Sequence, residues 1–197
     1  CVFSSLEAFL EAKPENNIAV CAIFDNEEVG SGSNHGAAST FLTDVLERIC
    51  LSLNLDKYLM YANSMLISAD NAHAVHPAHP EKSDPTNNVH MNKGVVIKVN
   101  AAQSYATDGL SSALFTSILD KVNVPYQYFT NRADLRGGGT LGNISSKHVS
   151  MMCVDMGLPQ LAMHSSNETA GVKDVDYAIR AFEKYYSVSI INKNGSF

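Results

Sequence analysis

The hydrophobic positions of the chain follow two patterns that alternate along its length. Apolar spacing typical of amphipathic helices leads us to expect helices at residues 2–12, 37–53, 110–122, 144–150 and 175–186. Short apolar runs, typical of strands, occupy residues 18–24, 64–70, 94–100, 126–130 and 151–155. Because strands and helices alternate, the pattern predicts one α/β domain over residues 1–197. We expect a three-layer α/β/α arrangement with a mixed, mostly parallel sheet.

Individual segments refine this expectation. The run IAVCAIF at residues 18–24 has the length and β-branched content of a buried parallel strand. The helix at residues 2–12 begins without a capping residue, which suggests that it belongs to a longer chain. Residues 71–93 form a polar loop with four histidines and three prolines, a length typical of functional loops. We expect the tail at residues 192–197 to fray.

The composition excludes several classes of protein. Hydrophobic residues make up 45% of the chain, and no apolar run approaches the roughly 20 residues that span a bilayer. The net charge of −6 and the lack of a basic cluster argue against a nucleic-acid partner. Four cysteines without a Cys-x-x-Cys pair argue against a thiolate zinc site. We therefore expect reduced thiols in a cytoplasmic protein without a membrane partner.

The candidate chemistry lies in polar residues that follow predicted strands, namely Glu27, Glu28, Asp70 and His164. In α/β sheets ligands bind beyond the carboxyl ends of the strands, so these residues can converge although they are far apart in sequence. Adjacent acids on extended backbone diverge, so one could bind a metal while the other acts as a general base. Taken singly, the acid pair could equally be a solvated turn and the histidine a structural residue.

Three further residues could contact a substrate. His73 follows Asp70 by three residues, although a self-contained metal cluster among the loop histidines has unfavourably loose spacing. Lys98 lies within an apolar strand, where an ammonium needs an anionic partner unless its head reaches water. Gly138, in the middle of a three-glycine turn, would allow close backbone approach to a ligand, or would simply make the turn flexible. The residues alone therefore indicate an α/β hydrolase-like domain with a possible metal site.

Four segments extend across nearly the whole chain: FDNEEVGSGSNHGA, ISADNAHAVHP, GVVIKVNAAQSYAT and GTLGNISS…VDMGLPQLAMHSSNE. Together, and in this order, they resemble the M18 family of zinc aminopeptidases, which includes the aspartyl aminopeptidases.

The resemblance implies an aminopeptidase with two zinc ions in an α/β/α catalytic domain. By that resemblance Glu27 matches the general base, and Glu28, Asp70 and His164 match zinc ligands. Lys98 matches a lysine of the substrate pocket that recognises acidic side chains. The resemblance also implies peptide substrates and a homo-oligomer of twelve subunits.

The sequence also departs from the family pattern. A His-x-Asp ligand motif, a bridging aspartate and a dimerisation domain are absent, so we expect residues 1–197 to be the C-terminal portion of a catalytic domain. We expect this portion alone to be inactive. Two alternatives stay open: a related two-zinc amide hydrolase such as a deacylase, and a non-catalytic assembly module.

Overall fold

A computed structural model of the protein describes residues 1–190. Its main sheet has the strand order β1-β5-β3-β4. The strands are β1 (Met65–Ala69), β3 (Val95–Lys98), β4 (Tyr126–Phe129) and β5 (Met152–Gly157). β1 is parallel to β5 and β3 is parallel to β4, whereas β3 and β5 are antiparallel. The predicted mixed, mostly parallel sheet is therefore confirmed.

A smaller sheet continues from one end of the main sheet. It has the order β2-β6-β7, with β2 (Ala72–His73), β6 (Pro159–Leu161) and β7 (Thr169–Ala170). β1 leads into β2 and β5 leads into β6, and the N–H of Ala72 donates to the carbonyl of Leu158 at 2.9 Å between the two. Two stretches of backbone, at residues 70–71 and 157–158, therefore lie side by side where the sheets meet.

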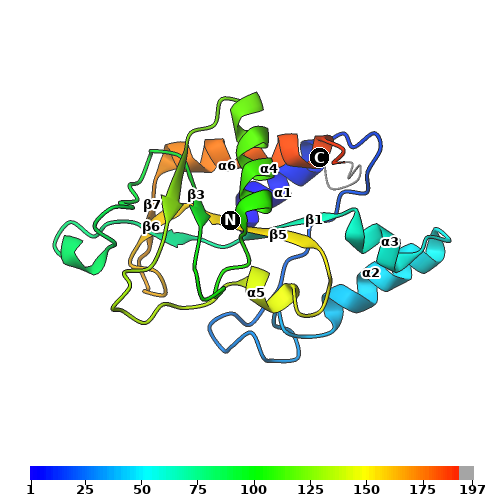
Figure 1. The fold of residues 1–197 in the computed structure, drawn as a ribbon, viewed down its shortest axis with the longest axis horizontal. Coiled ribbons are helices and arrows are strands. Elements are labelled where there is room, and N and C mark those ends of the chain that lie inside the picture. The colour runs from blue at the N-terminus through cyan, green and yellow to red at the C-terminus, as the bar shows by residue number, and fades with distance from the viewer. Residues whose placement is uncertain (191–197) are drawn as a thin grey trace.

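Helices cover both faces of the main sheet, which confirms the three-layer arrangement (Figure 1). On one face lie α1 (Val2–Glu11), α4 (Gly109–Lys121) and α6 (Val172–Ser187). On the other face, α5 (Leu141–Ser145) contacts β1 and β5, while α2 (Phe41–Ser52) and α3 (Lys57–Ala62) pack against each other beyond the start of β1. A 3₁₀ turn, η1 (Pro80–Lys82), lies in the long loop. Residues 192–197, which were expected to fray, lie outside the described residues.

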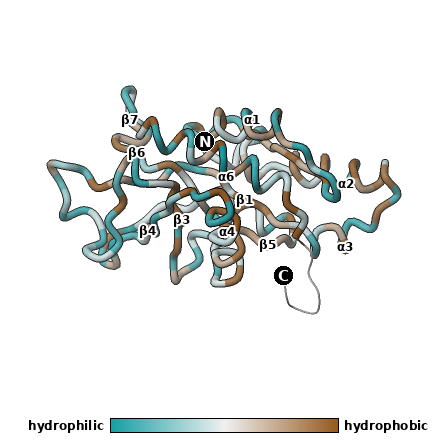
Figure 2. The backbone as a smooth tube through the Cα atoms, turned by 90° about the horizontal axis from the view of Figure 1, so that it is seen from above, coloured by the Kyte–Doolittle hydropathy of each residue, from teal (hydrophilic) through white to brown (hydrophobic). Residues whose placement is uncertain are grey.

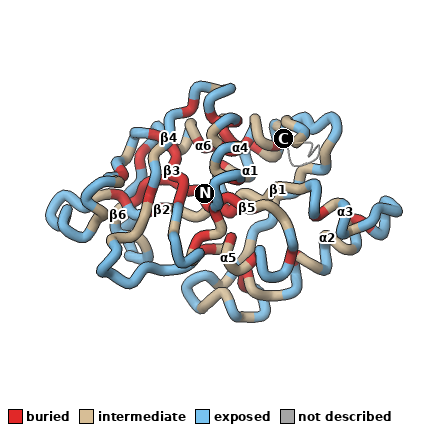
Figure 3. Tube along the Cα trace, viewed as in Figure 1, coloured by how far each residue is buried: buried red, intermediate tan, exposed pale blue. Residues whose placement is uncertain are grey.

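The core lies between the helix layer formed by α1, α4 and α6 and the central strands β3 and β5, where buried residues are concentrated (Figure 3). It is built from apolar side chains of β3, β5, α4 and α6, namely Val95, Ile97, Val154, Met156, Phe115, Leu119, Ala178, Ala181 and Phe182. The apolar stretch of β3 runs through the middle of the molecule (Figure 2). Because alternate residues of a strand face opposite sides, Val96 and Lys98 point away from this core. Val96 belongs to a second cluster with Tyr105 and Phe129.

The first predicted helix is present as α1, whereas the strand predicted after it is not. α1 buries its small residues Ser4 and Ala8, whereas its larger apolar residues Phe3, Leu6 and Leu10 are exposed. The prediction of a strand at residues 18–24 is wrong. This segment is extended but forms no ladder of backbone hydrogen bonds with any neighbour among residues 1–190. A strand requires a partner for its backbone groups.

The remaining predicted elements are present with shifted bounds. α2 begins at Phe41 rather than at residue 37, and α5 begins at Leu141, before the predicted start at residue 144. α3 was not predicted. It begins after Asp56, whose carboxylate caps the helix by accepting from the N–H groups of Tyr58 and Leu59. The four cysteines are free thiols. No helix within residues 1–190 is long and apolar enough to cross a membrane.

Candidate metal centre and substrate cleft

The paired acids lie in a tight turn that follows the extended segment at residues 18–24. The turn begins at Asn26, whose φ of 63° is in the left-handed region that asparagine tolerates. It is closed by a hydrogen bond of 2.8 Å from the N–H of Gly30 to the carbonyl of Asn26. The turn therefore presents Glu27 and Glu28 on an exposed surface.

His164 reaches the same place from the loop between β6 and β7. Its φ of 66° and the φ of 57° at Ala162 reverse the chain within this short connection. The N–H of His164 donates to Oε1 of Glu168 at 2.6 Å, which holds the loop closed. The histidine ring consequently points toward the acid turn, 136 residues away in sequence.

Glu27, Glu28 and His164 form the candidate metal centre. Nδ1 of His164 lies 2.8 Å from Oε1 of Glu28 and 3.5 Å from Oε2 of Glu27. One potential ligand atom from each residue falls within 4.8 Å of the others. Carboxylate oxygen and imidazole nitrogen are ligands that zinc prefers, so this set fits zinc chemically.

The two carboxylates control the protonation of His164. The hydrogen bond to Glu28 raises the pKa of His164 above its ordinary value of 6.5, and the charge of Glu27 raises it further. The ion pair is therefore fully present below pH 6.5 and is lost as the pH rises through the raised pKa. Because a metal binds only neutral imidazole, protons compete with metal at this site.

We expect an NMR titration of the metal-free protein to give His164 a pKa above 6.5. Glu28→Gln should move that pKa back toward 6.5, because it removes the larger cause of the shift. Glu27→Gln should move it less. Glu81→Gln is a matched control, because Glu81 pairs with His79 instead. An unchanged His164 titration in Glu28→Gln would contradict the contact.

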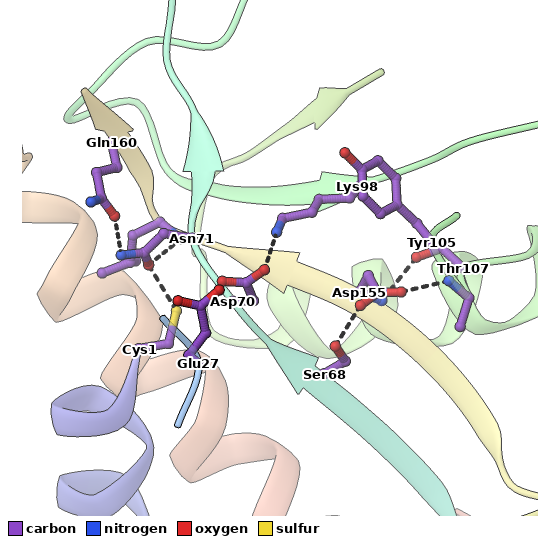
Figure 4. Close-up of polar contacts among 12 residues, drawn as sticks. Cys1, Glu27, Ser68, Asp70, Asn71, Lys98, Tyr105, Thr107, Asp155 and Gln160 are labelled. Atoms are coloured by element: carbon purple, nitrogen blue, oxygen red, sulfur yellow. Dashed lines mark hydrogen bonds and ion pairs between the residues drawn. The ribbon is translucent and has the colours of Figure 1, made fainter. Parts of the chain in front are cut away.

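Asp70 lies in a different set of contacts, at the junction of the two sheets. Its Oδ2 atom accepts from Nζ of Lys98 at 3.2 Å, and the lysine side chain is only 4% exposed (Figure 4). Burial lowers the pKa of Lys98, and the charge of Asp70 partly offsets this effect. The ammonium also lies 5.7 Å from the centroid of the Tyr105 ring. The anion that Lys98 was expected to need is, in this structure, a protein carboxylate.

Two residues that the sequence did not single out stabilise this junction. Asn71 accepts from the thiol of Cys1 at 3.0 Å and donates to the side chain of Gln160, so it joins α1 to β6. The fully buried Asp155 accepts from the hydroxyl of Ser68 and, at 2.5 Å, from the N–H of Ala106 (Figure 4). The signal for Asp155 was an acid within an apolar run, since a buried carboxylate requires several donors.

Gly157 allows the close approach of the two chains at this junction. A Cβ atom on Gly157 would lie 1.8 Å from the carbonyl oxygen of Asp70. We expect Gly157→Ala to lower the free energy of unfolding by about 1–3 kcal/mol or more, because backbone must shift to relieve the overlap.

Gly138→Ala is the matched control for this measurement. A Cβ atom on Gly138 would meet no atom within 4 Å, so we expect a change within about 0.5 kcal/mol. Urea unfolding of both variants measures the difference. Equal stabilities for the two variants would contradict the close packing at Gly157.

The other two predicted substrate residues, His73 and Gly138, lie in separate parts of the structure. His73 is in β2, its ring centroid 6.4 Å from that of Phe129. Burial lowers the pKa of His73, and the charges of Lys98 and His164 lower it further. Gly138 lies in the exposed loop that leads to α5, where it lines a shallow hollow with Asn131 and Arg136. Both positions are compatible with substrate contact.

A mixed sheet between helix layers, with carboxylate and imidazole groups gathered in nearby loops, is compatible with an α/β/α metallohydrolase. The family model described as "Aminopeptidase I zinc metalloprotease (M18)" matches residues 1–186. The chain belongs to this M18 family, which confirms the resemblance found in the sequence.

Individual relatives agree with the family match. The chain is 46% identical over 190 residues to "Probable M18 family aminopeptidase 2" of Clostridium novyi, covering 95% of this chain and 44% of the relative. It is 40% identical over 194 residues to "Probable aspartyl aminopeptidase" of Ricinus communis, covering 93% and 40%. The solved S. cerevisiae mApe1 dodecamer matches with a TM-score of 0.79 and 28% identity, covering 94% of this chain and 43% of that one. The chain thus spans less than half the length of these proteins.

Proposed function

We propose that this chain is part of the catalytic domain of a zinc aminopeptidase that removes N-terminal residues from peptides. The observation that carries the proposal is the convergence of Glu27, Glu28 and His164 within 4.8 Å, from two turns far apart in sequence. Membership of a family described as zinc metalloproteases supports the choice of metal.

In this proposal Glu28, Asp70 and His164 would serve as ligands that hold two zinc ions. When bound, zinc polarises the scissile carbonyl and makes an attacking water more acidic. Asp70 would have to divide its oxygens between metal and Lys98, since its Oδ2 atom lies 3.2 Å from the ammonium. Its side chain is 42% exposed, which leaves it accessible to both.

Glu27 serves as the general base in the proposed reaction. Its carboxylate lies beside the ligand set, 3.5 Å from His164, and its side chain is 61% exposed. It can therefore accept a proton from the attacking water and return it to the leaving amine.

Lys98 is the proposed determinant of a preference for acidic N-terminal residues. It is a cation in an otherwise apolar strand, close to Asp70 and to His73. The R. communis relative, named "Probable aspartyl aminopeptidase", supports this preference. His73 and the backbone at Gly138 would complete the substrate contacts.

The whole protein is further proposed to be a cytoplasmic homo-oligomer. The support is the S. cerevisiae neighbour, which is a dodecamer. Residues 1–197 would then be the C-terminal portion of each catalytic domain, with the remaining ligands and the dimerisation domain supplied by the rest of the protein.

A chimera tests the function directly. The matched 190 residues of the C. novyi relative are replaced by the corresponding residues of this chain, which are 46% identical. We expect the chimera to bind zinc and to release the N-terminal residue of Glu-peptides faster than that of Leu-peptides. Hydrolysis of N-acetylated substrates only would instead indicate a deacylase. Zinc binding without any hydrolysis would indicate an assembly module.

A further inference from the structure

The hollow that Gly138 lines is a positively charged region of an acidic chain. It has a volume of about 430 Å³ and is formed by the residues after β3, the residues after β4, the glycine-rich turn and α5. Among residues 1–190, no Asp or Glu lines it, although the chain has 20 acidic residues against 14 basic ones. Its polar side chains are those of Asn100, Ser104, Asn131, Arg132, Arg136 and Asn143. The hollow therefore offers many hydrogen-bond donors and positive charge.

The two arginines of the hollow differ in their partners. Nε of Arg132 lies 2.7 Å from Oδ1 of Asp134, and the same guanidinium donates to the carbonyl of Glu81 in the long loop. Arg136 is exposed, and the ion pairs found within residues 1–190 do not include it. The planar fork of a guanidinium matches the two oxygens of a carboxylate. Arg136 is therefore available to bind a carboxylate from outside the chain.

The glycines of the turn shape the floor of the hollow. A Cβ atom on Gly137 would lie 2.2 Å from Nδ2 of Asn131, so only glycine lets the asparagine amide lie against the turn. A Cβ atom on Gly138 would meet no atom within 4 Å, so this stretch of backbone faces open space. A ligand in the hollow can therefore approach the backbone closely as well as the Arg136 side chain.

The hollow is connected to Lys98 through Tyr105. The ammonium of Lys98 lies 5.7 Å from the centroid of the Tyr105 ring, which is only 5% exposed (Figure 4). The hydroxyl of the same ring accepts from Nδ2 of Asn131 at 3.0 Å, and Asn131 lines the hollow. The face of one buried ring is thus near the lysine, while its hydroxyl end is at the wall of the hollow. Lys98 and Arg136 are therefore cations on two sides of one tyrosine.

We propose that the hollow is a second carboxylate subsite, in which Arg136 binds an acidic side chain at the second or third position of the peptide. This inference rests on the proposed function, because Lys98 would receive the carboxylate of the first residue. An extended peptide advances by about 3.3–3.6 Å per residue, so side chains one or two residues apart can reach both sides of an aromatic ring. The substrates would be peptides with closely spaced acidic residues at the N-terminus.

The chemistry of the hollow favours a carboxylate over other side chains. An apolar side chain would remove water from the amide and guanidinium groups without replacing its hydrogen bonds. A cationic side chain would be repelled by Arg132 and Arg136. A free phosphate would use the same donors as a carboxylate, so the two anions must be distinguished by experiment.

Paired substrates of the C. novyi chimera test the subsite. One pair is Glu-Glu-Ala-Ala-NH₂ and Glu-Gln-Ala-Ala-NH₂, and the other is Glu-Ala-Glu-Ala-NH₂ and Glu-Ala-Gln-Ala-NH₂, so each pair differs by one carboxylate. We expect a preference of about three- to tenfold in kcat/KM for the acidic member of at least one pair, a modest value because Arg136 is exposed. About 0.5 M NaCl should weaken this preference.

Two arginine variants locate the charge responsible. Arg136→Gln should reduce the preference to about one. Arg48→Gln is the matched control, because Arg48 is an exposed arginine of α2 that does not line the hollow, and it should retain the preference. Equal kcat/KM within both pairs of substrates, or a preference that survives Arg136→Gln, would overturn the proposal.

A titration of the metal-free chain separates this inference from the proposed function. Glutarate should shift the amide NMR signals of Gly137, Gly138 and Gly139, and the shifts should be lost in Arg136→Gln. Equal or larger shifts with inorganic phosphate would show a general anion site and would overturn the assignment to carboxylate. If the chimera cleaves Glu-peptides but neither the preference nor the glutarate shifts are observed, this inference alone fails. If the shifts are observed but the chimera cleaves no peptide, the proposed function fails and the substrate role of the hollow fails with it.

Discussion

Glu27→Gln in the C. novyi chimera is expected to lower peptidase turnover by about 10²–10⁴-fold while leaving the zinc content unchanged. Glutamine keeps the shape of the side chain and loses the proton acceptor. Glu27 is also the more distant of the two acids from His164, at 3.5 Å against 2.8 Å for Glu28. The substitution should therefore affect proton transfer far more than the ligand set.

Glu28→Gln is the matched variant for this comparison. It removes the carboxylate in direct contact with His164 and should lower zinc affinity as well as turnover. Metal analysis of both purified variants, together with turnover of a Glu-peptide, separates the two roles. Zinc loss in Glu27→Gln with retention in Glu28→Gln would show that the roles are exchanged. Full turnover of Glu27→Gln with zinc bound would contradict a general base at this position.

The second large effect concerns the pair of Asp70 and Lys98. In metal-free protein, Asp70→Asn should lower the free energy of unfolding by about 3 kcal/mol, because it leaves a buried ammonium without its anion. The value is at the low end for buried pairs because Asp70 is 42% exposed. Lys98→Met should be nearly neutral, since methionine fills a similar volume and the remaining carboxylate can be hydrated. Urea unfolding in the presence of a chelator measures both changes.

The same lysine variant tests the proposed specificity. If a substrate carboxylate pairs with Lys98, Lys98→Met in the chimera should cost roughly 2–5 kcal/mol in kcat/KM on Glu-peptides and much less on Leu-peptides. If Asp70 remains its partner throughout turnover, both substrates should suffer alike. Equal losses would rule out the specificity role without affecting the roles of Glu27 and Glu28.

The sequence predicted the fold best where local pattern and tertiary packing agree. β3 is fully buried, as its continuous apolar run indicated, and α6 packs on the core with one apolar face. Residues 18–24 carry an equally clear strand pattern and are not a strand. The hydrophobic pattern indicates which side chains a segment buries, but a strand also needs a neighbour for its backbone hydrogen bonds. Within residues 1–190, this segment has no such neighbour.

The types of residue in the candidate site were predictable from the sequence, whereas which of these residues contact each other was less so. Residues that follow strands were expected to converge, and Glu28 and His164 do lie together. The need of Lys98 for an anion followed from its apolar strand. That the anion is Asp70 could not be deduced, because it depends on how β1 and β3 are placed across β5. The role of Asp70 as a zinc ligand stays a prediction.

The order of strands in the main sheet has a consequence for synthesis on the ribosome. β5 lies between β1 and β3, although it is made after both of them. Met65 pairs with Met152, so the first contacts of β1 within this sheet wait for a stretch of chain far downstream. Until β5 emerges, β1 and the β3–β4 pair expose apolar edges with nothing between them, a state prone to aggregation. Completion of β5 therefore sets the point in translation at which β1 and the β3–β4 pair can first join into one sheet.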